Sequence, residues 1–208
     1  MKKTKKNYRG FTIIELLIAT AVFSVVLLVF VTAFLRISEL FYKGINLSNT
    51  QESARNLVQN ITNDIRFSGQ APQVYLSQGY FCVGSHRYSF VKGSQYTPNS
   101  ATNYGVVKET RDCVAPTGSN TPDFANAEEM LDPGMQLNDI QLGCPNNLCN
   151  ISVHVVFYGS DNSVLASTDP AFSANQWQAP DAQCSGPVNS TQYCATADFQ
   201  STVLQRTN

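Results

Sequence analysis

The sequence predicts an α+β protein in which one long N-terminal helix packs on an antiparallel β-sheet domain with long loops and disulfides. A segment compatible with a helix runs from residue 11 to residue 69 without a proline. Short β-like runs separated by Gly, Asn, Ser and Pro follow it, and all six cysteines lie among these runs. We therefore divide the 208 residues into segments 1–10, 11–35, 36–69 and 70–208.

Residues 1–10 form a basic leader in front of an apolar segment. Five of the 14 Lys and Arg residues lie in this leader, and Glu15 is the only charged residue between Phe11 and Leu35. As a helix the apolar segment spans about 37 Å, more than the ~30 Å hydrocarbon core of a bilayer. The positive-inside rule keeps the leader in the cytoplasm and places the chain after Arg36 outside. The segment is therefore expected to span the membrane and to carry an extracytoplasmic domain.

Two simpler interpretations of the apolar segment explain it less well. A cleaved secretory signal has an apolar core of about 7–15 residues and a small-x-small cleavage site, whereas Leu16–Leu35 alone is longer and Val31–Ala33 matches such a site poorly. A simple membrane anchor leaves Glu15 unexplained, because a charged side chain costs about 2.5–3.5 kcal/mol at the centre of a bilayer. This cost is smaller near the end of a span, so an interfacial Glu15 stays an alternative.

Residues 36–69 are predicted to continue the helix in amphipathic form. Apolar residues recur there with helical spacing and create one face that seeks a core. They are Leu47, Ala54, Leu57, Val58, Ile61 and Ile65. Gly69, followed by Pro72, is a stop signal for the helix, and Gly44 marks a candidate bend.

Residues 70–208 are predicted to form a β-rich domain laid on the apolar face of the helix. Strands are expected near residues 74–76, 80–83, 87–91, 104–108, 135–142, 151–158, 164–167 and 202–206. Apolar side chains alternate onto one face of residues 151–158, and the turn residues after them predict a hairpin with residues 164–167. Segment 92–127, around its one strand, and segment 169–198 are predicted to be long loops for binding or subunit contact, or to be disordered.

The cysteines predict disulfides formed outside the cytoplasm, because their number is even and they lie in a loop-rich region. Six cysteines allow 15 pairings, among which sequence does not choose. Local pairs are favoured, namely Cys144 with Cys149 and Cys184 with Cys194, which leaves Cys82 with Cys113. The rival interpretation is a metal site, but "CPNNLC" separates its cysteines by four residues and no histidine lies near it in the sequence.

Residues 70–208 contain few candidate catalytic residues, and the chain is not expected to be an enzyme. No triad pattern surrounds His86 or His154, and no GxSxG, HExxH, Walker or Rossmann motif is present. No cofactor is expected; Asp169 and the turn "GSDNS" could offer oxygens to Ca²⁺, but their spacing does not match an EF-hand. Trp177 is expected to anchor a loop on the core. Outside the leader nine basic residues stand against 15 acidic ones, so no nucleic-acid partner is indicated.

The stretch "KKNYRGFTIIELLIATAVFSVVL" resembles the type III signal of type IV pilins and type II secretion pseudopilins. The resemblance implies that a prepilin peptidase cuts between Gly10 and Phe11 and that the new amino group of Phe11 is methylated. It also implies that Glu15 pairs with the cleaved N-terminus of a neighbouring subunit, since a buried charge is tolerated when it is paired. The implied partners are this peptidase, other minor and major pilins through the N-terminal helix, and inner-membrane lipid before assembly.

The stretch "SARNLVQNITNDIRFSG" resembles the end of the spine helix in PilW-like and PulJ-like minor pilins. The matching positions are Ala54, Arg55, Asp64, Ile65, Arg66, Ser68 and Gly69. Together the two resemblances imply a pilin-like fold and a non-enzymatic minor pilin of a type IV pilus, which acts at or near the filament tip when assembly begins. The alternatives are a minor pseudopilin of a type II secretion system, a competence pilus subunit, and a tip adhesin anchored by the helix.

Overall fold

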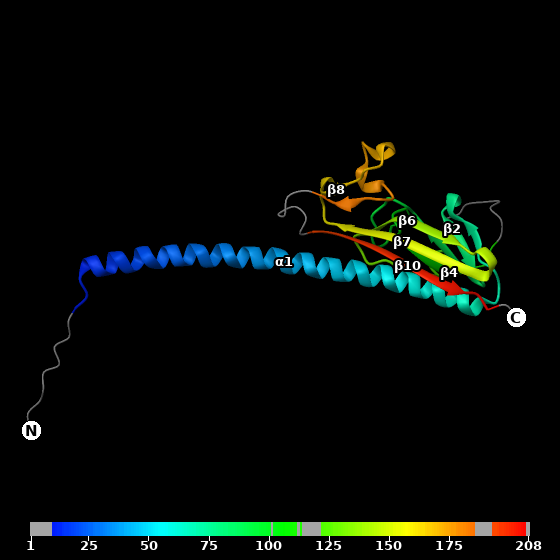
Figure 1. Ribbon diagram of the computed structural model, residues 1–208, viewed down its shortest axis with the longest axis horizontal. Coiled ribbons are helices and arrows are strands. Elements are labelled where there is room, and N and C mark those ends of the chain that lie inside the picture. The colour runs from blue at the N-terminus through cyan, green and yellow to red at the C-terminus, as the bar shows by residue number, and fades with distance from the viewer. Residues whose placement is uncertain (1–9, 101, 112, 114–121, 186–192, 207–208) are drawn as a thin grey trace, which may run out of the picture. The chain divides into compact units, whose positions relative to one another are not determined.

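The computed structural model describes residues 10–100, 102–111, 113, 122–185 and 193–206. Two units are present, Met1–Phe41 and Tyr42–Asn208, and the long helix α1 (Ile13–Ser68) contributes to both. The second unit adds antiparallel sheets to the helix (Figure 1). The predicted α+β class is therefore confirmed, and each unit is described by itself below.

In the first unit α1 is apolar on every side. All of its large apolar side chains from Ile13 to Leu35 are exposed. Among the described residues, α1 is the one helix long and apolar enough by length and composition to cross a membrane. Water-soluble proteins rarely expose apolar surface on this scale, so this half of the helix needs lipid or other helices around it.

In the second unit one face of α1 is buried. The predicted apolar face is confirmed from Ala54 onward, but Leu47 is 39% exposed and does not belong to it. Among the residues of α1, burial begins only at Thr50. The buried set is Thr50, Ser53, Ala54, Leu57, Val58, Ile61, Thr62 and Ile65.

The helix ends where the sequence predicted. Gly69 adopts a left-handed φ of 64°, which only glycine accepts at low cost. The Ser68 hydroxyl donates to the carbonyl of Ile65, one of the carbonyls that the helix leaves without a backbone partner. Gly44 lies inside α1, whose helical assignment continues on both sides of it.

In the described residues, ten strands form three antiparallel sheets. The five-stranded sheet is a meander of β1 (Gln73–Tyr75), β2 (Tyr80–Val83), β3 (His86–Phe90), β4 (Val106–Thr110) and β5 (Ala127–Glu129). The three-stranded sheet has the order β10-β7-β6, with β6 at Met135–Gly143, β7 at Leu148–Tyr158 and β10 at Cys194–Leu204. A small sheet pairs β8 (Leu165–Ala166) with β9 (Gln183–Cys184).

Three expectations about the strands are wrong. The last strand starts at Cys194, not near Thr202, so the predicted loop 169–198 contains both β9 and the first half of β10. Strand β5 was not predicted at all. The expected hairpin between residues 151–158 and 164–167 does not form, because β6 and β10 occupy the two edges of β7 and β8 pairs with β9 instead.

The main core lies between α1 and the two larger sheets. Leu57, Ile61 and Ile65 of the helix meet Phe81 and Tyr88 of the five-stranded sheet and the inward row of β7. The rings of Phe81 and Tyr88 stack with centroids 4.9 Å apart. The inward row of β7 is the alternating apolar row predicted from sequence, and it consists of Ile151, Val153, Val155 and the partly buried Phe157.

The opposite face of β7 carries a smaller core, which sequence did not predict. Val156 and Tyr158 pack there against Val164 and Leu165, and the partly buried Trp177 lies against this cluster. Trp177 therefore packs on a core from a loop, as expected. The chain from residue 159 to residue 185 covers this part of the sheet.

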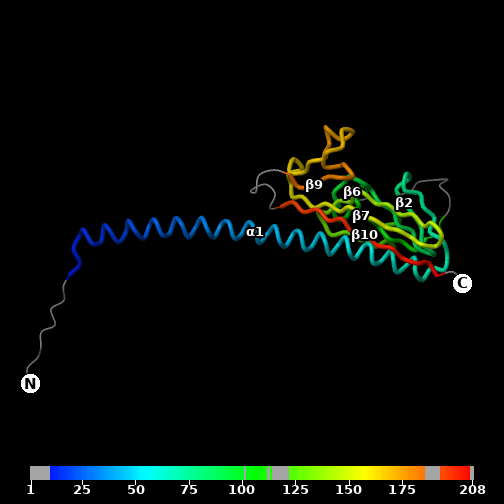
Figure 2. Tube along the Cα trace, in the orientation of Figure 1, coloured from blue at the N-terminus to red at the C-terminus, as the bar shows by residue number. Residues whose placement is uncertain are grey.

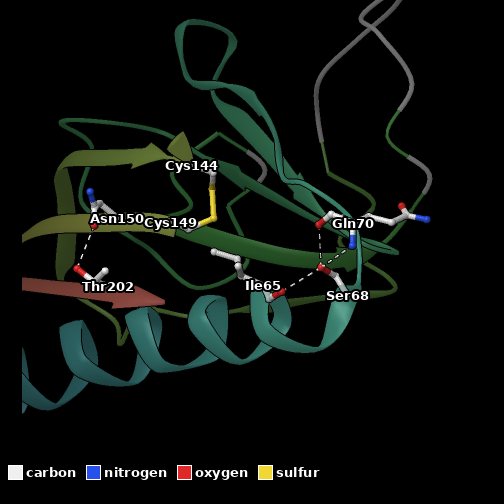
Figure 3. Close-up of a disulfide and its surroundings, with 7 residues drawn as sticks. All are labelled: Ile65, Ser68, Gln70, Cys144, Cys149, Asn150 and Thr202. Atoms are coloured by element: carbon white, nitrogen blue, oxygen red, sulfur yellow. Dashed lines mark hydrogen bonds between the residues drawn. A yellow bond between two sulfur atoms is a disulfide. The ribbon is translucent and has the colours of Figure 1, made fainter. Parts of the chain in front are cut away.

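The three disulfides join the pairs favoured from sequence, Cys82–Cys113, Cys144–Cys149 and Cys184–Cys194. Cys144–Cys149 closes the connection between β6 and β7, above the last turn of α1 (Figure 3). Its cysteines, the only ones spaced closely enough to suggest a metal site, are thus joined to each other. Cys184–Cys194 ties the short strand β9 to the start of β10.

Candidate processing and assembly site

The predicted cleavage site lies immediately before α1 in exposed chain. Phe11 is 83% exposed, and a Cβ atom added to Gly10 would meet no atom within 4 Å. Neither crowding nor a left-handed φ therefore requires a glycine at position 10. The remainder of the leader, residues 1–9, lies outside the described residues.

Glu15 closes the first turn of α1 together with Thr12. One carboxylate oxygen of Glu15, Oε2, accepts from the backbone N–H of Thr12 at 2.9 Å and from its hydroxyl at 2.8 Å. In return the Thr12 hydroxyl oxygen accepts from the backbone N–H of Glu15 at 3.3 Å. This reciprocal pair is a capping box, in which two backbone donors at the helix start find side-chain acceptors.

The sequence reasoning missed this capping role of Glu15. The sequence pattern that predicts this role is the spacing Thr12-x-x-Glu15 directly before an apolar run, which is the pattern of a capping box. The negative carboxylate also lies at the positive end of the helix dipole. Glu15 therefore has a function inside its own chain that does not depend on any neighbour.

The two oxygens of the Glu15 carboxylate differ in their surroundings. Both capping bonds end on Oε2, and among the described residues no hydrogen bond reaches Oε1. The side chain is exposed on a helix with no other charged residue between Phe11 and Leu35. An ionised carboxylate accepts several hydrogen bonds at once, so Oε1 can take a donor from another molecule while the cap stays closed.

The residues that resemble the end of a spine helix attach α1 to the five-stranded sheet. Oδ2 of Asp64 accepts from the Tyr88 hydroxyl at 2.6 Å and lies 2.9 Å from the Lys108 ammonium and 3.0 Å from Nδ1 of His86. Ala54 and Ile65 are buried in the core, whereas the Arg55 side chain is exposed. The structure thus assigns Asp64 a packing role and explains His86 as its partner.

His154 and the acidic turn residues also have structural partners. Nδ1 of the buried His154 lies 2.6 Å from Oδ1 of Asp198, and Nε2 lies 2.8 Å from the carbonyl oxygen of Ala182. Asp161 and Asp169 each accept a backbone N–H two residues ahead and so cap short 3₁₀ turns. In the part of the chain that the structure describes, no group of three or more His, Cys, Asp or Glu side chains could hold a metal ion.

Comparison with known proteins identifies the N-terminal segment. Residues 5–31 match the family model described as "Prokaryotic N-terminal methylation motif". No curated protein and no solved structure gives a significant match to the chain.

The matched motif and the fold together define the class of this molecule. It is a pilin-like protein with an N-terminal methylation motif, a long N-terminal helix on antiparallel sheets, and three disulfides. Chains of this class are structural rather than enzymatic, and their motif implies processing by a prepilin peptidase and assembly with other pilins in general. The apolar half of α1 fits membrane anchoring before assembly into a surface filament.

Proposed function

We propose that this chain is a minor pilin of a type IV pilus, assembled at or near the filament tip when a filament is initiated. The single observation that carries the proposal is the Glu15 carboxylate, which stands alone in an apolar helix half within the matched motif. In lipid this charge is costly, and it becomes tolerable when a neighbouring subunit supplies a cation. The proposed function therefore explains a residue that a plain membrane anchor does not.

The proposed processing step creates the required cation. The peptidase hydrolyses the amide bond between Gly10 and Phe11, so water supplies a carboxylate to Gly10 and an amino group to Phe11. An α-amino group is largely protonated at neutral pH, and methylation keeps its basic nitrogen. Because the chain itself does not require glycine at position 10, the requirement for it is assigned to the peptidase, whose active site must reach this bond.

Pairing between subunits uses the second oxygen of Glu15. The bonds to Thr12 occupy Oε2 and hold the side chain against the first turn. Oε1 then receives the ammonium group of Phe11 from a neighbouring subunit when apolar helices pack side by side. The capping box and the intersubunit ion pair coexist, and the cap positions the carboxylate before the neighbour arrives.

Two substitutions of Glu15 separate the cap from the charge. Glu15→Gln keeps a side-chain oxygen that accepts in a capping box but carries no charge, whereas Glu15→Ala removes both. We expect both variants to be cleaved after Gly10 and both to be lost from filaments. The measurement is the amount of each full-length chain in purified filaments relative to membranes. Incorporation of Glu15→Gln at the wild-type level would show that the cap alone matters and that no ion pair forms.

The minor role rests on the length of the chain and on the second resemblance. Removal of ten residues from 208 leaves a mature chain that is long for a major pilin subunit. The stretch from Ala54 to Gly69 resembles minor pilins. Deletion of the gene should therefore reduce the number of filaments, while the filaments that remain consist almost entirely of another subunit. A type II secretion system or a competence pilus is the alternative setting, and genes for the assembly machinery beside this one would identify it.

A second candidate function, a tip adhesin, is favoured by one hollow in the second unit. The lining of the hollow includes the aromatic residues Tyr96, Tyr104 and Phe124 together with Glu129. The rings of Tyr104 and Phe124 meet edge to face with centroids 5.4 Å apart. Aromatic rings beside a few polar groups are typical of ligand sites. Phe124→Ala should then abolish adhesion of cells and leave the filament number unchanged; a parallel loss of both would speak against an adhesin.

A further inference from the structure

Strand β10 is a long open edge of the three-stranded sheet. It has 11 residues, and its register with β7 is unbroken from Cys194 opposite Tyr158 to Leu204 opposite Leu148. It lies alongside α1 in the second unit (Figure 2). No described strand pairs with its other side.

The hydrogen-bond pattern shows which groups of β10 point away from β7. At the two ends of the ladder, Gly159 donates its N–H to the carbonyl of Tyr193, and Gln205 donates to the carbonyl of Asn147. Opposed residues in an antiparallel ladder alternate between hydrogen-bonded and non-hydrogen-bonded pairs. The odd-numbered residues of β10 therefore bond to β7, and the N–H and C=O groups of the even-numbered residues point outward. These are residues 194, 196, 198, 200, 202 and 204, and among the described residues no backbone hydrogen bond reaches them from outside the β7 ladder.

This edge lacks the features that normally prevent strand addition. Proteins protect edge strands with proline, lysine, bulges or covering segments. Strand β10 contains no Pro, Lys, Arg or Gly, and its single charge, Asp198, lies against His154.

The opposite edge of the same sheet provides the contrast. Strand β6 has a register shift between Leu137 and Asp139. Its outer side also receives the N–H groups of Gly93 and Tyr96, at 2.9 and 2.7 Å. One edge of the sheet is thus covered and the other is available.

A polar groove runs along the open edge. One wall is β10 at Thr196–Phe199, and the other is a stripe of α1 that presents amides, a carboxylate and a guanidinium. The stripe consists of Ser48, Gln51, Glu52, Arg55, Asn56 and Gln59. Such amides donate to and accept from a peptide backbone. The groove therefore offers hydrogen bonds to a ligand from both walls.

We propose that this groove receives an extended segment of a neighbouring subunit, which adds to β10 as a fourth strand of the sheet. Six outward N–H and C=O sets repeat every second residue of β10, about 6.8 Å apart, and a β-strand presents its own donors and acceptors at the same spacing. The walls carry Glu52, Arg55 and Asp198, so their net charge is close to neutral and favours a segment of low charge. This inference rests on the proposed function, because assembly brings the neighbour to the groove.

The test places a photo-cross-linking amino acid at Gln200 of the full-length chain in its own cells. We expect irradiation to join the chain to another subunit of the filament, because directly opposed side chains on paired strands lie about 5 Å apart. The same amino acid at Ser173, which is exposed on the segment between β8 and β9, serves as the control and should give no such adduct. No adduct from Gln200 in chains that are cleaved and incorporated would overturn the proposal.

A proline–alanine pair tests the backbone groups themselves. Thr202→Pro removes an outward N–H and leaves the ladder to β7 intact, whereas Thr202→Ala keeps the N–H and changes only the side chain. We expect the proline to lower the yield of the Gln200 adduct at least about tenfold relative to the alanine. Equal yields from the two variants would overturn the proposal. If Thr202→Pro does not fold, judged by its disulfides and thermal unfolding, Thr196→Pro and Thr196→Ala replace the pair.

The two proposals fail in different ways. If Glu15→Gln is incorporated at the wild-type level, no intersubunit ion pair forms and the proposed role of Glu15 is wrong. The yield of the Gln200 adduct still tests the fourth strand independently. A chain that needs the Glu15 charge for incorporation but gives no adduct from Gln200 retains the proposed function and loses the fourth strand. If both prolines at positions 196 and 202 prevent folding, the comparison of Gln200 with Ser173 decides.

Discussion

At the scale of single residues, Asp64 joins the helix to the five-stranded sheet. Three donors from β3 and β4, on Tyr88, Lys108 and His86, surround one of its carboxylate oxygens. Tyr88 is fully buried, so its hydroxyl finds no water when the carboxylate is removed. The stability of the second unit is therefore expected to depend on Asp64.

Asp64→Ala should lower the free energy of unfolding by about 2–3 kcal/mol, because it leaves a buried hydroxyl and an ammonium without their shared acceptor. The measurement is denaturant unfolding of the full-length chain in detergent, followed by near-ultraviolet circular dichroism. Glu52→Ala removes an exposed carboxylate from the same helix and should change the value by less than about 0.5 kcal/mol. Similar losses for the two variants would contradict the assigned role.

The Tyr88 hydroxyl also predicts how stability changes at alkaline pH. Burial first, and then the hydrogen bond to Asp64, raise the pKa of Tyr88 above its ordinary value of 10.0. The folded chain therefore keeps the proton where the unfolded chain loses it, so this contribution to stability is complete below pH 10 and declines above it. Tyr88→Phe should flatten the decline of stability measured between pH 9 and pH 11. An unchanged slope would show that other groups cause it.

At the scale of elements, buried polar residues hold the segment that covers the outer face of the three-stranded sheet. Asn138 lies at the bulge of β6 and donates to the carbonyls of Trp177 and Ala179, at 2.8 and 2.6 Å. Gln136 adds a second bond to Trp177, and His154 reaches Ala182. The sheet β8–β9 has only two residues in each strand, so it depends on these anchors and on the disulfide to β10.

Asn138→Ala should loosen this segment without unfolding the unit. Loss of the amide removes one of the two donors that reach each of these carbonyls, because Gln136 still bonds to Trp177 and the N–H of Ala182 to Ala179. The cost of the two lost hydrogen bonds together is about 1–3 kcal/mol. Amide hydrogen exchange should accelerate in residues 164–184 and stay unchanged in Leu57–Ile65 of α1. Faster exchange along α1 as well would show that the segment and the main core unfold together.

The disulfide Cys184–Cys194 is expected to stabilise the same region. It closes a loop with a sequence separation of 10, and chain-entropy arguments assign such a link about 2–4 kcal/mol. The double variant Cys184→Ser/Cys194→Ser, which leaves no single thiol behind, should lower the melting temperature and open β9 to proteolysis. The equivalent double variant at Cys144 and Cys149 is the control, and it should leave β9 protected.

The elements differ in how well the sequence predicts them, for physical reasons. The helix follows from the absence of proline up to residue 71, from the spacing of Ala54 to Ile65, and from Gly69, all of which are local signals. In the first half of β10, "CATADFQ", the alternation of polar and apolar residues is weak. Asp198 and Gln200 are exposed on one face, and the buried positions before them include the small residues Ala195 and Ala197. Its partner, β7, lies more than 30 residues earlier in the chain, so the pairing is invisible to local patterns.

The candidate site was only partly predictable for the same reason. Gly10, Phe11 and Glu15 belong to one continuous motif and could be named from sequence. The cap on Thr12 follows from a four-residue spacing that was overlooked. The partners of Asp64 come from β3 and β4, and the groove beside β10 depends on where the last strand pairs, so neither follows from local sequence.

At the scale of the whole molecule, the two units carry different chemistry. The first holds an apolar helix half with one carboxylate, and the second holds the sheets, the disulfides, the aromatic hollow and the groove beside β10. Substitutions in the first unit should affect membrane insertion and filament incorporation. Substitutions in the second should affect stability and contacts made by the sheets. Thr202→Pro is expected to weaken the contact with a neighbour without unfolding the second unit.

The central claim is that the chain becomes a filament subunit by losing its leader after Gly10. Intact-mass and N-terminal analysis of the chain recovered from filaments tests it most directly. The account predicts a chain that begins at an N-methylated Phe11 and lacks the first ten residues. A chain that still begins at Met1, recovered from membranes of cells with an active prepilin peptidase, would contradict it.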